Sequence, residues 1–370
     1  MVNFSKLKIM TILGTRPEII RLSRILPKMD ECFEHIVVFT NQSFSYELSG
    51  LFFKELELRK PNYILSVKAD SLGKQIANIF SQTEEVMVKE KPDALLVLGD
   101  TNSSLAAVMA KRLKIKIFHM EAGNRSFDWD VPEEVNRRVV DHISDINLPY
   151  TEHSRRYLIE EGIHPGSIYV TGSPLREVFE FFKNKIESST ILKQLELEPK
   201  KYFVVSAHRE ENIDNDKHLT ELILALNVLA EQYKMPVIIS LHPRTKNRLK
   251  KIKFKANSLL QFHVPFGYFD FNKLQKNSLC VLSDSGTIQE ESAILGFSAI
   301  QIRKSSERPE AFDTGSIILT GFNKDIILNA INLLISEEND NKVIPKDYDD
   351  NNVSSKIVKL IMGFTRNHPA

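Results

Sequence analysis

The chain has 370 residues, which is enough for about two domains with separate hydrophobic cores. Hydrophobic residues make up 42% and charged residues 26%, as in ordinary globular proteins, and the formal net charge of +1 excludes a bulk attraction to nucleic acid or to an anionic membrane. The two cysteines lie far apart in the sequence, no apolar run reaches about 18 residues, and no signal peptide begins the chain. We therefore expect a cytoplasmic protein without a nucleic-acid or membrane partner.

The first half of the chain alternates buried-type strands with amphipathic helices. Continuous apolar runs predict strands at residues 8–13, 35–40, 94–98, 116–119 and 146–148. Apolar residues at helical spacing predict helices at residues 71–88, 105–113, 132–142 and 153–161. Another helix is expected from Pro17, because proline suits the first helical position. This alternation is typical of a parallel sheet covered by helices.

A second series of the same kind starts after Gly172-Ser173-Pro174. It contains predicted strands at residues 202–205, 237–241, 259–263, 279–282 and 298–302. Its predicted helices are at residues 219–233, 287–295, 324–336 and 353–364, and the lysine-rich stretch 246–255 is interpreted as a solvated helix face. We therefore predict an α/β fold with two doubly wound Rossmann-like domains, residues 1–172 and residues 173–352. Such domains bind ligands at the carboxyl ends of their strands.

The stretch from Leu279 to Glu291 has the pattern of a nucleotide site. A short apolar strand is followed by the polar turn Ser283-Asp284-Ser285-Gly286, and a helix is expected to begin at Thr287. Such a turn directs free N–H groups and the positive end of the helix dipole toward a phosphate. Glu291 follows Ser285 at a helical spacing, so its carboxylate can face the same crevice and reach ribose hydroxyls. An ordinary capped helix is the alternative interpretation.

Polar residues follow several predicted strands directly, where doubly wound folds place their ligands. These residues are Arg16, Asp100, Glu121, His208, His242 and Ser285. Single members have structural alternatives: Asp100 can cap a helix, and His208 can be a hydrogen-bonded loop residue. Glu133 and Glu134 suit a first helical turn because of the helix dipole. Independent caps need not all fall at one edge of the sheets, so we interpret the set as parts of one ligand site.

Two arginines are candidates for neutralising a diphosphate, Arg16 and Arg308. A charge-assisted hydrogen bond of this kind contributes about 1.5–3 kcal/mol, and surface ion pairing is the alternative for Arg308. The first turn, Gly14-Thr15-Arg16-Pro17-Glu18, is not G-x-G-x-x-G, and no acidic residue ends the second strand, which argues against a dinucleotide redox cofactor. No Cys/His cluster has metal-ligand spacing either. We therefore expect neither a cofactor nor a metal ion.

Motifs along nearly the whole chain, in order, resemble the non-hydrolysing UDP-N-acetylglucosamine 2-epimerases. The motifs are Gly14-Thr15-Arg16-Pro17-Glu18, Gly99-Asp100-Thr101, Glu121-Ala122-Gly123, Pro132-Glu133-Glu134-Val135-Asn136-Arg137, His208-Arg209-Glu210, Asp284-Ser285-Gly286-Thr287-Ile288-Gln289-Glu290-Glu291 and Glu307-Arg308-Pro309-Glu310. The resemblance implies the GT-B fold, in which two Rossmann-like domains flank a cleft, and a homodimer. It also implies that a C-terminal helix, residues 353–370, returns to the first domain.

The resemblance assigns roles residue by residue. It implies that the catalytic residues are Asp100, Glu121, Glu133 and His208. It implies that the substrate, a UDP-2-acetamido sugar, is bound by Arg16, Arg21, His242, Phe271, Ser285, Gly286, Thr287, Glu291 and Arg308, with Glu291 at the ribose and Phe271 at the uracil. The family reaction removes UDP from C1 and a proton from C2, which leaves a bound glycal, and then adds UDP back with the proton on the other face. Carboxylates suit this chemistry because they stabilise positive charge at C1 and can act as a base.

Some positions depart from the family pattern. Arg21 stands where the family often has lysine, and Phe266 where it often has glutamine, while residues 41–45 lack the Gln-His pattern linked to allosteric control in some members. Residues 121–134 and 148–156 resemble the capsule and O-antigen branch, which converts UDP-2-acetamido-2,6-dideoxy-L-talose to UDP-N-acetyl-L-fucosamine. A 6-deoxy sugar favours an apolar contact at C6, for which Phe127 or Trp129 is suited.

Three other interpretations of the function stay open at this point. The first is epimerisation between UDP-N-acetylglucosamine and UDP-N-acetylmannosamine. The second is a glycosyltransferase, because the GT-B fold serves both activities. The third is a nucleotide-sugar binding module without turnover.

Overall fold

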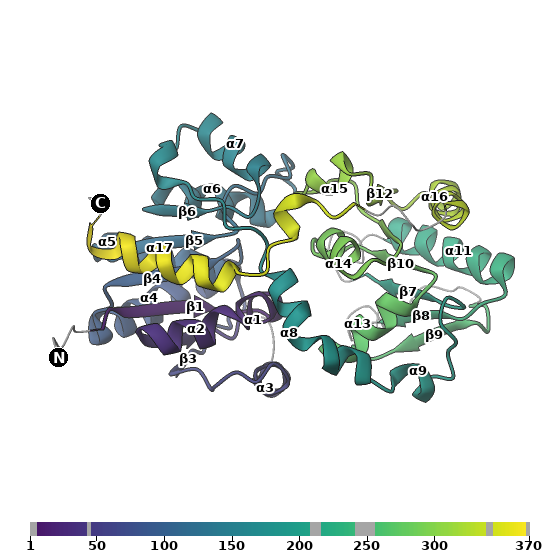
Figure 1. The fold of residues 1–370 in the computed structure, drawn as a ribbon, viewed down its shortest axis with the longest axis horizontal. Coiled ribbons are helices and arrows are strands. Elements are labelled where there is room, and N and C mark those ends of the chain that lie inside the picture. Colours follow the sequence, from purple (N-terminus) through teal and green to yellow (C-terminus); the bar gives the residue numbers. More distant parts are fainter. Residues whose placement is uncertain (1–5, 43–45, 208–215, 241–255, 338–342, 368–370) are drawn as a thin grey trace. The chain divides into compact units, whose positions relative to one another are not determined.

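The structure is a computed structural model that describes residues 6–42, 46–207, 216–240, 256–337 and 343–367 (Figure 1). His208, His242 and the lysine-rich stretch 246–255 lie outside the described residues. The chain forms two compact units: unit 1 comprises Met1–Glu180 and Lys346–Ala370, and unit 2 comprises Phe181–Pro345. The domain limits expected from the sequence, after residues 172 and 352, stay a prediction.

Unit 1 is built on a six-stranded parallel sheet with the order β3-β2-β1-β4-β5-β6. Its strands are β1 (Lys8–Leu13), β2 (Glu34–Phe39), β3 (Tyr63–Ile64), β4 (Ala94–Leu98), β5 (Lys116–Met120) and β6 (Ile146–Leu148). The central strands β4 and β5 are buried along their whole length. Helices that connect parallel strands cover both faces of a sheet, which explains the continuous apolar runs in the sequence.

The helices of unit 1 differ in their caps, and some begin at a residue whose side chain accepts a hydrogen bond from the helix N-terminus. They are α1 (Arg16–Leu22), α2 (Ile25–Cys32), α3 (Tyr46–Glu55), α4 (Leu72–Glu90), α5 (Ala106–Arg112), α6 (Pro132–Ile143), α7 (Glu152–Glu160) and α17 (Val353–Asn367), with short 3₁₀ turns η1 (Asn102–Leu105), η2 (Pro165–Ser167) and η4 (Lys346–Tyr348). The side chain of Ser71 accepts a hydrogen bond from Lys74 N at the start of α4, and Lys91 ends that helix in the left-handed conformation.

The last helix, α17, packs on the first part of unit 1. It lies beside α2 (Figure 1). Lys116 Nζ of β5 donates a hydrogen bond to the carbonyl oxygen of Phe364 at 3.0 Å. A cation at the end of a helix satisfies carbonyl groups that have no partner inside the helix. The C-terminal segment is therefore a structural part of unit 1.

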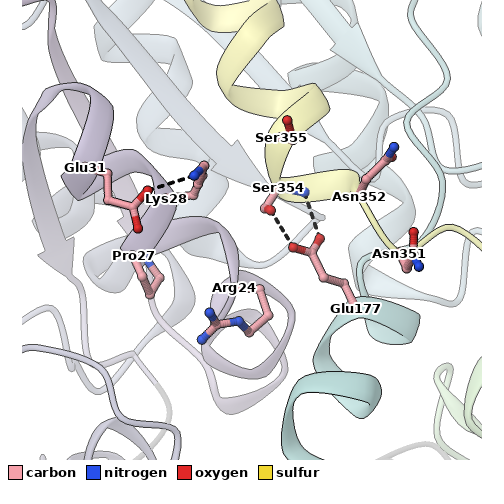
Figure 2. A pocket seen from close by; sticks show the side chains of 9 residues that line it. All are labelled: Arg24, Pro27, Lys28, Glu31, Glu177, Asn351, Asn352, Ser354 and Ser355. Carbon is pink, nitrogen blue, oxygen red and sulfur yellow. Dashed lines mark hydrogen bonds and ion pairs between the residues drawn. The ribbon is translucent and has the colours of Figure 1, made fainter.

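Helix α8 (Leu175–Ser188) begins in unit 1 and ends in unit 2, and its first turn is fastened to α17. Glu177 of α8 accepts hydrogen bonds from the backbone N, at 2.9 Å, and from the hydroxyl group of Ser354 (Figure 2). A hollow of about 370 Å³ lies beside this link, with Arg24 and Lys28 on its α2 side. Ser173 N also donates to Asp347 O at 2.9 Å. The two segments that pass between the units are thus joined to each other within unit 1.

Unit 2 repeats the same design with a second parallel sheet, in the order β12-β11-β10-β7-β8-β9. Its strands are β7 (Phe203–Ser206), β8 (Val237–Ser240), β9 (Leu260–His263), β10 (Cys280–Ser283), β11 (Ala299–Gln301) and β12 (Ile318–Leu319). Its described helices besides α8 are α9 (Ile191–Gln194), α11 (Asp216–Tyr233), α13 (Tyr268–Asn277), α14 (Ile288–Leu295), α15 (Glu310–Asp313) and α16 (Lys324–Ser336). One apolar cluster packs α11 and α16 on the sheet, and a second packs α9, α13 and α14 on it.

The strand orders of the two sheets correspond, so each sheet has one topological switch point, between β1 and β4 in unit 1 and between β7 and β10 in unit 2. Ligands of doubly wound sheets bind outside the carboxyl ends of the strands at this point. The predicted α/β fold with two Rossmann-like units is confirmed. Among the described residues, no helix combines the length and apolar character needed to cross a bilayer.

Candidate active site

The turn after β1 lies against the loop after β4. A Cβ atom at Gly14 would lie 2.0 Å from Ser103 Oγ and 2.2 Å from Thr40 Oγ1, so only glycine fits there. Arg16 follows as the first residue of α1, and its guanidinium carbon lies 5.2 Å from the centre of the Phe52 ring. Arg16 is therefore placed at the switch point of unit 1, as the sequence predicts.

Glu18 closes this turn from within α1. Its side chain is buried, and one carboxylate oxygen accepts hydrogen bonds from Gly14 N at 3.1 Å, from Thr15 N at 2.7 Å and from Thr15 Oγ1 at 2.6 Å. The other oxygen accepts a hydrogen bond from Thr101 Oγ1 at 3.3 Å. Burial raises the pKa of Glu18 to about 7, although each of these hydrogen bonds acts to lower it.

We expect the Glu18→Gln variant to lose less stability than the wild type as the pH rises through neutrality. With its raised pKa, the folded protein takes up a proton between pH 4.5 and about 7 that the unfolded chain does not bind. The resulting stabilisation is complete below pH 4.5 and is lost as the pH rises through about 7, with an upper limit on the order of 3 kcal/mol. Urea unfolding near pH 5.5 and near pH 8.5 measures this difference, and equal losses in both proteins would contradict it.

Asp100 is held at the end of β4 by residues of α6. Its carboxylate accepts a hydrogen bond from Arg137 Nε at 2.7 Å, and its backbone oxygen accepts one from Asn136 Nδ2 at 2.9 Å. Thr101, and not Asp100, is the N-cap of the following 3₁₀ turn, with its hydroxyl accepting from Ser103 N at 3.3 Å. The alternative that Asp100 only caps its helix is therefore wrong. About a fifth of the Asp100 side chain, 21%, is exposed, so the carboxylate is accessible to a ligand.

Glu121 occupies the corresponding place after β5. It is buried, its φ of +62° is rare for a residue with a side chain, and its carboxylate forms an ion pair with Arg21 of α1. Asn124 Nδ2 donates to the second carboxylate oxygen at 3.1 Å, and the Arg21 guanidinium lies 5.6 Å from the centre of the Tyr150 ring. The structure thus brings together two predicted site residues, Arg21 and Glu121, that are 100 positions apart in the sequence.

The two glutamates that begin α6 have different environments. Glu133 is half-buried in the first turn, whereas Glu134 is fully buried. Glu134 Oε2 accepts hydrogen bonds from Ser126 N at 3.0 Å and from Arg137 Nη1 at 2.8 Å. Burial acts to raise the pKa of Glu134, but the Ser126 hydrogen bonds and the Arg137 charge outweigh it and hold the pKa below its usual value. Glu134 therefore orients Arg137, which in turn holds Asp100.

A buried ionic cluster lies behind these residues. Asp141 of α6 is fully buried and lies 2.8 Å from Arg125 Nη1 and 2.9 Å from His119 Nδ1. Burial acts to raise the pKa of Asp141, but His119 and Arg125 outweigh it and keep the pKa low. Arg125 also binds Glu161, the residue that follows α7, at 2.6 Å. The cluster joins β5, α6 and α7 and so supports the loop that contains Glu121.

In unit 2, the polar turn after β10 has the predicted form, with the helix starting one residue later. Thr287 is the N-cap residue, α14 begins at Ile288, and Ser285 Oγ accepts a hydrogen bond from Thr287 N at 3.2 Å. Ser285 N donates to Ser283 Oγ at 3.1 Å. The Ser285 N–H group, which was expected to be free for a phosphate, is therefore engaged within the turn.

Glu291 is oriented toward this turn, as its helical spacing predicts. Thr287 Oγ1 donates to one of its carboxylate oxygens at 2.6 Å, and Gln275 Nε2 of α13 donates to the other at 2.9 Å. Phe271 lies on the same helix as Gln275 and is half-buried against the apolar cluster of α9, α13 and α14. The hydrogen bonds leave a carboxylate with fixed orientation beside the start of α14.

Arg308 binds the other side of the same turn. Its Nε donates to Gly286 O at 2.8 Å, and its Nη1 lies 3.3 Å from Glu290 Oε1, with only 4% of the Arg308 side chain exposed. The alternative that Arg308 forms a surface ion pair is therefore wrong. A second buried pair, Arg303 with Glu307 at 2.8 Å, holds the loop in which Arg308 lies.

The chain is similar to known proteins over most of its length. The family model described as UDP-N-acetylglucosamine 2-epimerase matches residues 27–362. The chain belongs to this family. The UDP-N-acetylglucosamine 2-epimerase of Methanocaldococcus jannaschii is 38% identical over 341 residues, which cover 90% of this chain and 93% of the relative. A UDP-2,3-diacetamido-2,3-dideoxy-D-glucuronate 2-epimerase of Pseudomonas aeruginosa is 33% identical over 88% of this chain and 91% of the relative.

A solved structure of the Methanocaldococcus jannaschii UDP-GlcNAc 2-epimerase, in complex with UDP-GlcNAc and UDP, superimposes with a TM-score of 0.90. It is 35% identical and covers 97% of this chain and 100% of that chain. As a member of the UDP-N-acetylglucosamine 2-epimerase family, this chain is an isomerase with the GT-B fold. Within the described residues, no group of His, Cys, Asp and Glu side chains has an arrangement that could hold a metal ion.

Several residues that orient the site of this epimerase were not singled out from the sequence. Arg137 and Asn136 hold Asp100, Glu290 binds Arg308, and Gln275 binds Glu291. Asn136, Arg137 and Glu290 belong to motifs that resemble the family, so their place in the motif was a usable signal. Gln275 belongs to none of those motifs, and only the packing of α13 beside α14 brings it to Glu291.

Proposed function

We propose that this chain is a non-hydrolysing C2 epimerase that converts UDP-2-acetamido-2,6-dideoxy-L-talose to UDP-N-acetyl-L-fucosamine, a precursor of capsule or O-antigen. The observation that supports an epimerase most directly is the pair of carboxylates Asp100 and Glu121. Each is held by an arginine, Arg137 and Arg21, at the end of one of two neighbouring parallel strands, β4 and β5. Parallel neighbours end at the same edge of a sheet, so both carboxylates serve one small region.

The chemistry of C2 epimerisation requires this kind of pair. The C2 proton has no adjacent carbonyl group, so it becomes acidic only as the C1–O bond breaks and C1 gains positive charge. One carboxylate accepts the C2 proton while the other stabilises the charge at C1. UDP leaves with the C1–O electron pair, and a glycal remains. UDP then adds back to C1, and an acid delivers a proton to the opposite face of C2. We assign these roles to Asp100 and Glu121, with Glu133 and His208 as further proton donors or acceptors.

The UDP group is assigned to residues of unit 2, with Arg16 of unit 1. The α14 start with Ser285, Gly286 and Thr287 is assigned to the diphosphate through the helix dipole, and Arg308, which binds Gly286 O, is assigned as the cation beside it. Glu291 is proposed to accept hydrogen bonds from the ribose hydroxyls and Phe271 to stack on the uracil. His242 is also assigned to the substrate, because it directly follows the predicted strand at residues 237–241. These assignments are supported by the hydrogen bonds that orient Glu291 and by the ion pair that orients Arg308.

The 6-deoxy sugar is proposed because of two exposed aromatic rings in the loop before α6. Phe127 is 63% exposed, its φ of +54° is strained for an aromatic residue, and its ring meets that of Tyr157 edge-on at 5.2 Å. Trp129 is 66% exposed and lies against the guanidinium of Arg138, 5.0 Å from ring centre to Cζ. Either ring can cover an apolar C6 methyl group. UDP-N-acetylglucosamine is the second candidate substrate, because similar proteins are named UDP-N-acetylglucosamine 2-epimerases.

Incubation with each candidate sugar in deuterated water tests the proposal. UDP-N-acetyl-L-fucosamine and UDP-N-acetylglucosamine are supplied separately, and C2 deuterium is followed by mass spectrometry and NMR. Faster incorporation into the first sugar supports the proposal, and faster incorporation into the second assigns the enzyme to the second substrate. Transfer to an acceptor with C2 untouched would indicate a glycosyltransferase, and tight binding without either change would indicate a binding module.

We predict that Glu291→Gln weakens UDP binding by about 10- to 100-fold, because a charged acceptor contributes about 1.5–3 kcal/mol. Wild-type protein should bind 2′-deoxy- or 3′-deoxy-UDP with a similar loss, and the variant should no longer distinguish that analogue from UDP. Calorimetric titration measures each affinity. Glu187→Gln is a suitable control in the same unit, because the described ion pairs of Glu187 are with Lys273 and Lys276 of α13. If the variant still distinguishes UDP from both deoxy analogues, Glu291 does not contact the ribose.

We also propose that the enzyme is a cytoplasmic homodimer, in line with the family resemblance. Sedimentation velocity at micromolar concentration measures its mass in solution. A single species at the 42.4 kDa mass of one chain would contradict the dimer.

A further inference from the structure

The loop after β4, which contains Asp100, is bound from several neighbouring elements. Ser103 Oγ forms hydrogen bonds with Thr40 Oγ1 at 2.6 Å and with Gln42 Oε1 at 2.7 Å. Asn102 Nδ2 donates to Gln75 Oε1 of α4 at 2.9 Å. Arg137 and Asn136 bind the loop from the α6 side, and α1 packs on a further side of it. Glu18 lies there.

The Glu18 side chain hydrogen-bonds both turns of the unit 1 switch point, one through each carboxylate oxygen. Oε2 binds the turn after β1, through Gly14 N and through the N and Oγ1 atoms of Thr15. Oε1 binds the loop after β4, through Thr101 Oγ1 at 3.3 Å. Arg16 follows directly after the first turn, and Asp100 directly precedes Thr101. Capping of α1 explains the contacts of Oε2 but not the contact of Oε1.

We propose that Glu18 is a positioning residue of the epimerase: through Thr101 it fixes the Asp100 loop relative to the turn that contains Arg16. This inference rests on the proposed function of Asp100. With only about 2% of its surface exposed, Glu18 does not reach the substrate itself. Its effect on the reaction is geometric, because proton transfer from C2 depends on where the Asp100 carboxylate lies.

The burial of Glu18 supports a role beyond capping. A carboxyl group in this position costs stability when ionised, since burial raises its pKa to about 7. A glutamine or a solvent-exposed glutamate forms a capping box without that cost. The partner at Oε1 is a hydroxyl group, which donates to a carboxylate and accepts from a protonated carboxyl group. The link between the two turns is therefore kept in both protonation states.

Substitution of Thr101 separates positioning from capping. Thr101→Val removes the link from Oε1 and leaves the three hydrogen bonds at Oε2, whereas Thr15→Val removes one bond at Oε2 and leaves the link. We expect Thr101→Val to lower kcat about 10- to 100-fold with UDP affinity unchanged, and Thr101→Ser to restore it. Thr15→Val is expected to lower the Tm while kcat stays within about twofold of wild type.

Thr101 also caps the 3₁₀ turn through Ser103 N, so a double-mutant cycle with Glu18→Ala isolates the link. If kcat losses of Thr101→Val and Glu18→Ala overlap instead of multiplying, the two residues act together. If Thr101→Val lowers kcat no more than Thr15→Val does, or if Thr101→Ser fails to restore it, the positioning role is overturned.

The same cycle distinguishes this failure from failure of the proposed function. The rate is measured as C2 deuterium incorporation into whichever UDP-sugar the wild type accepts. Wild-type protein without any incorporation would refute the proposed function and, with it, the positioning role. Wild-type incorporation with unaffected variants would refute the positioning role alone.

Discussion

Replacing Glu121 by glutamine is expected to lower kcat for C2 epimerisation by about 10² to 10⁴, the range over which a positioned acid or base contributes. The glutamine keeps the shape of the side chain and can still accept the hydrogen bond from Asn124, but it cannot take a proton or stabilise positive charge at C1. UDP affinity should change less than about threefold, because the residues assigned to UDP belong mainly to unit 2. Deuterium incorporation and calorimetric UDP binding on the same protein measure the two effects.

Loss of stability must be separated from loss of chemistry in this variant. Glu121→Gln leaves Arg21 buried without its carboxylate, which is costly in a protein interior. The double variant Arg21→Met, Glu121→Gln also removes the buried cation and is expected to recover most of the Tm but none of the turnover. Recovery of turnover together with the Tm, or near-normal turnover in the single variant, would show that Glu121 is a structural residue.

Replacing Asp141 by asparagine is expected to lower the free energy of unfolding by about 3–5 kcal/mol, because it removes the fully buried anion shared by His119 and Arg125 and leaves Arg125 with the carboxylate of Glu161. Asp70→Asn is a matched control: Asp70 also pairs with a cation, Lys74, but its side chain is 73% exposed. That change should cost no more than about 1 kcal/mol. Urea unfolding near neutral pH measures both differences.

The effect of Asp141→Asn should depend on pH. The pKa of Asp141 is held low in the folded protein by His119 and Arg125, so its contribution is present above the ordinary aspartate pKa of about 3.9 and is lost as the pH falls through the folded value. The difference between wild type and variant should therefore shrink in acid. A constant difference down to the acid transition would mean that packing, and not charge, accounts for the loss.

Much of the fold could be predicted from local sequence. The strands β1, β4 and β6 have the predicted bounds, because strands buried on both faces read as continuous apolar runs. The two-residue strands β3 and β12 were missed, since two residues carry no periodic signal. The sequence does not predict helix α8, because Gly172-Ser173-Pro174 is interpreted as the boundary between the two series, whereas a helix starts at Leu175 and continues from unit 1 into unit 2.

The site was predictable as a set of residues but not as a set of contacts. Position after a strand singled out Asp100 and Glu121, and the strand order places both at one edge of the sheet. The ion pair between Arg21 and Glu121 joins positions far apart in the sequence, so no spacing rule indicates it. The burial of Glu18 depends on how α1, β1 and the loop after β4 pack together, which its motif alone does not describe.

The return of α17 to unit 1 determines the order in which the protein can be completed during synthesis. A ribosome makes α2 and β5 early, but the helix that packs on α2, and whose final turn binds Lys116, emerges only after all of unit 2. Nascent unit 1 must therefore keep an apolar face uncovered while unit 2 folds, the stage at which partly built proteins are most prone to aggregate.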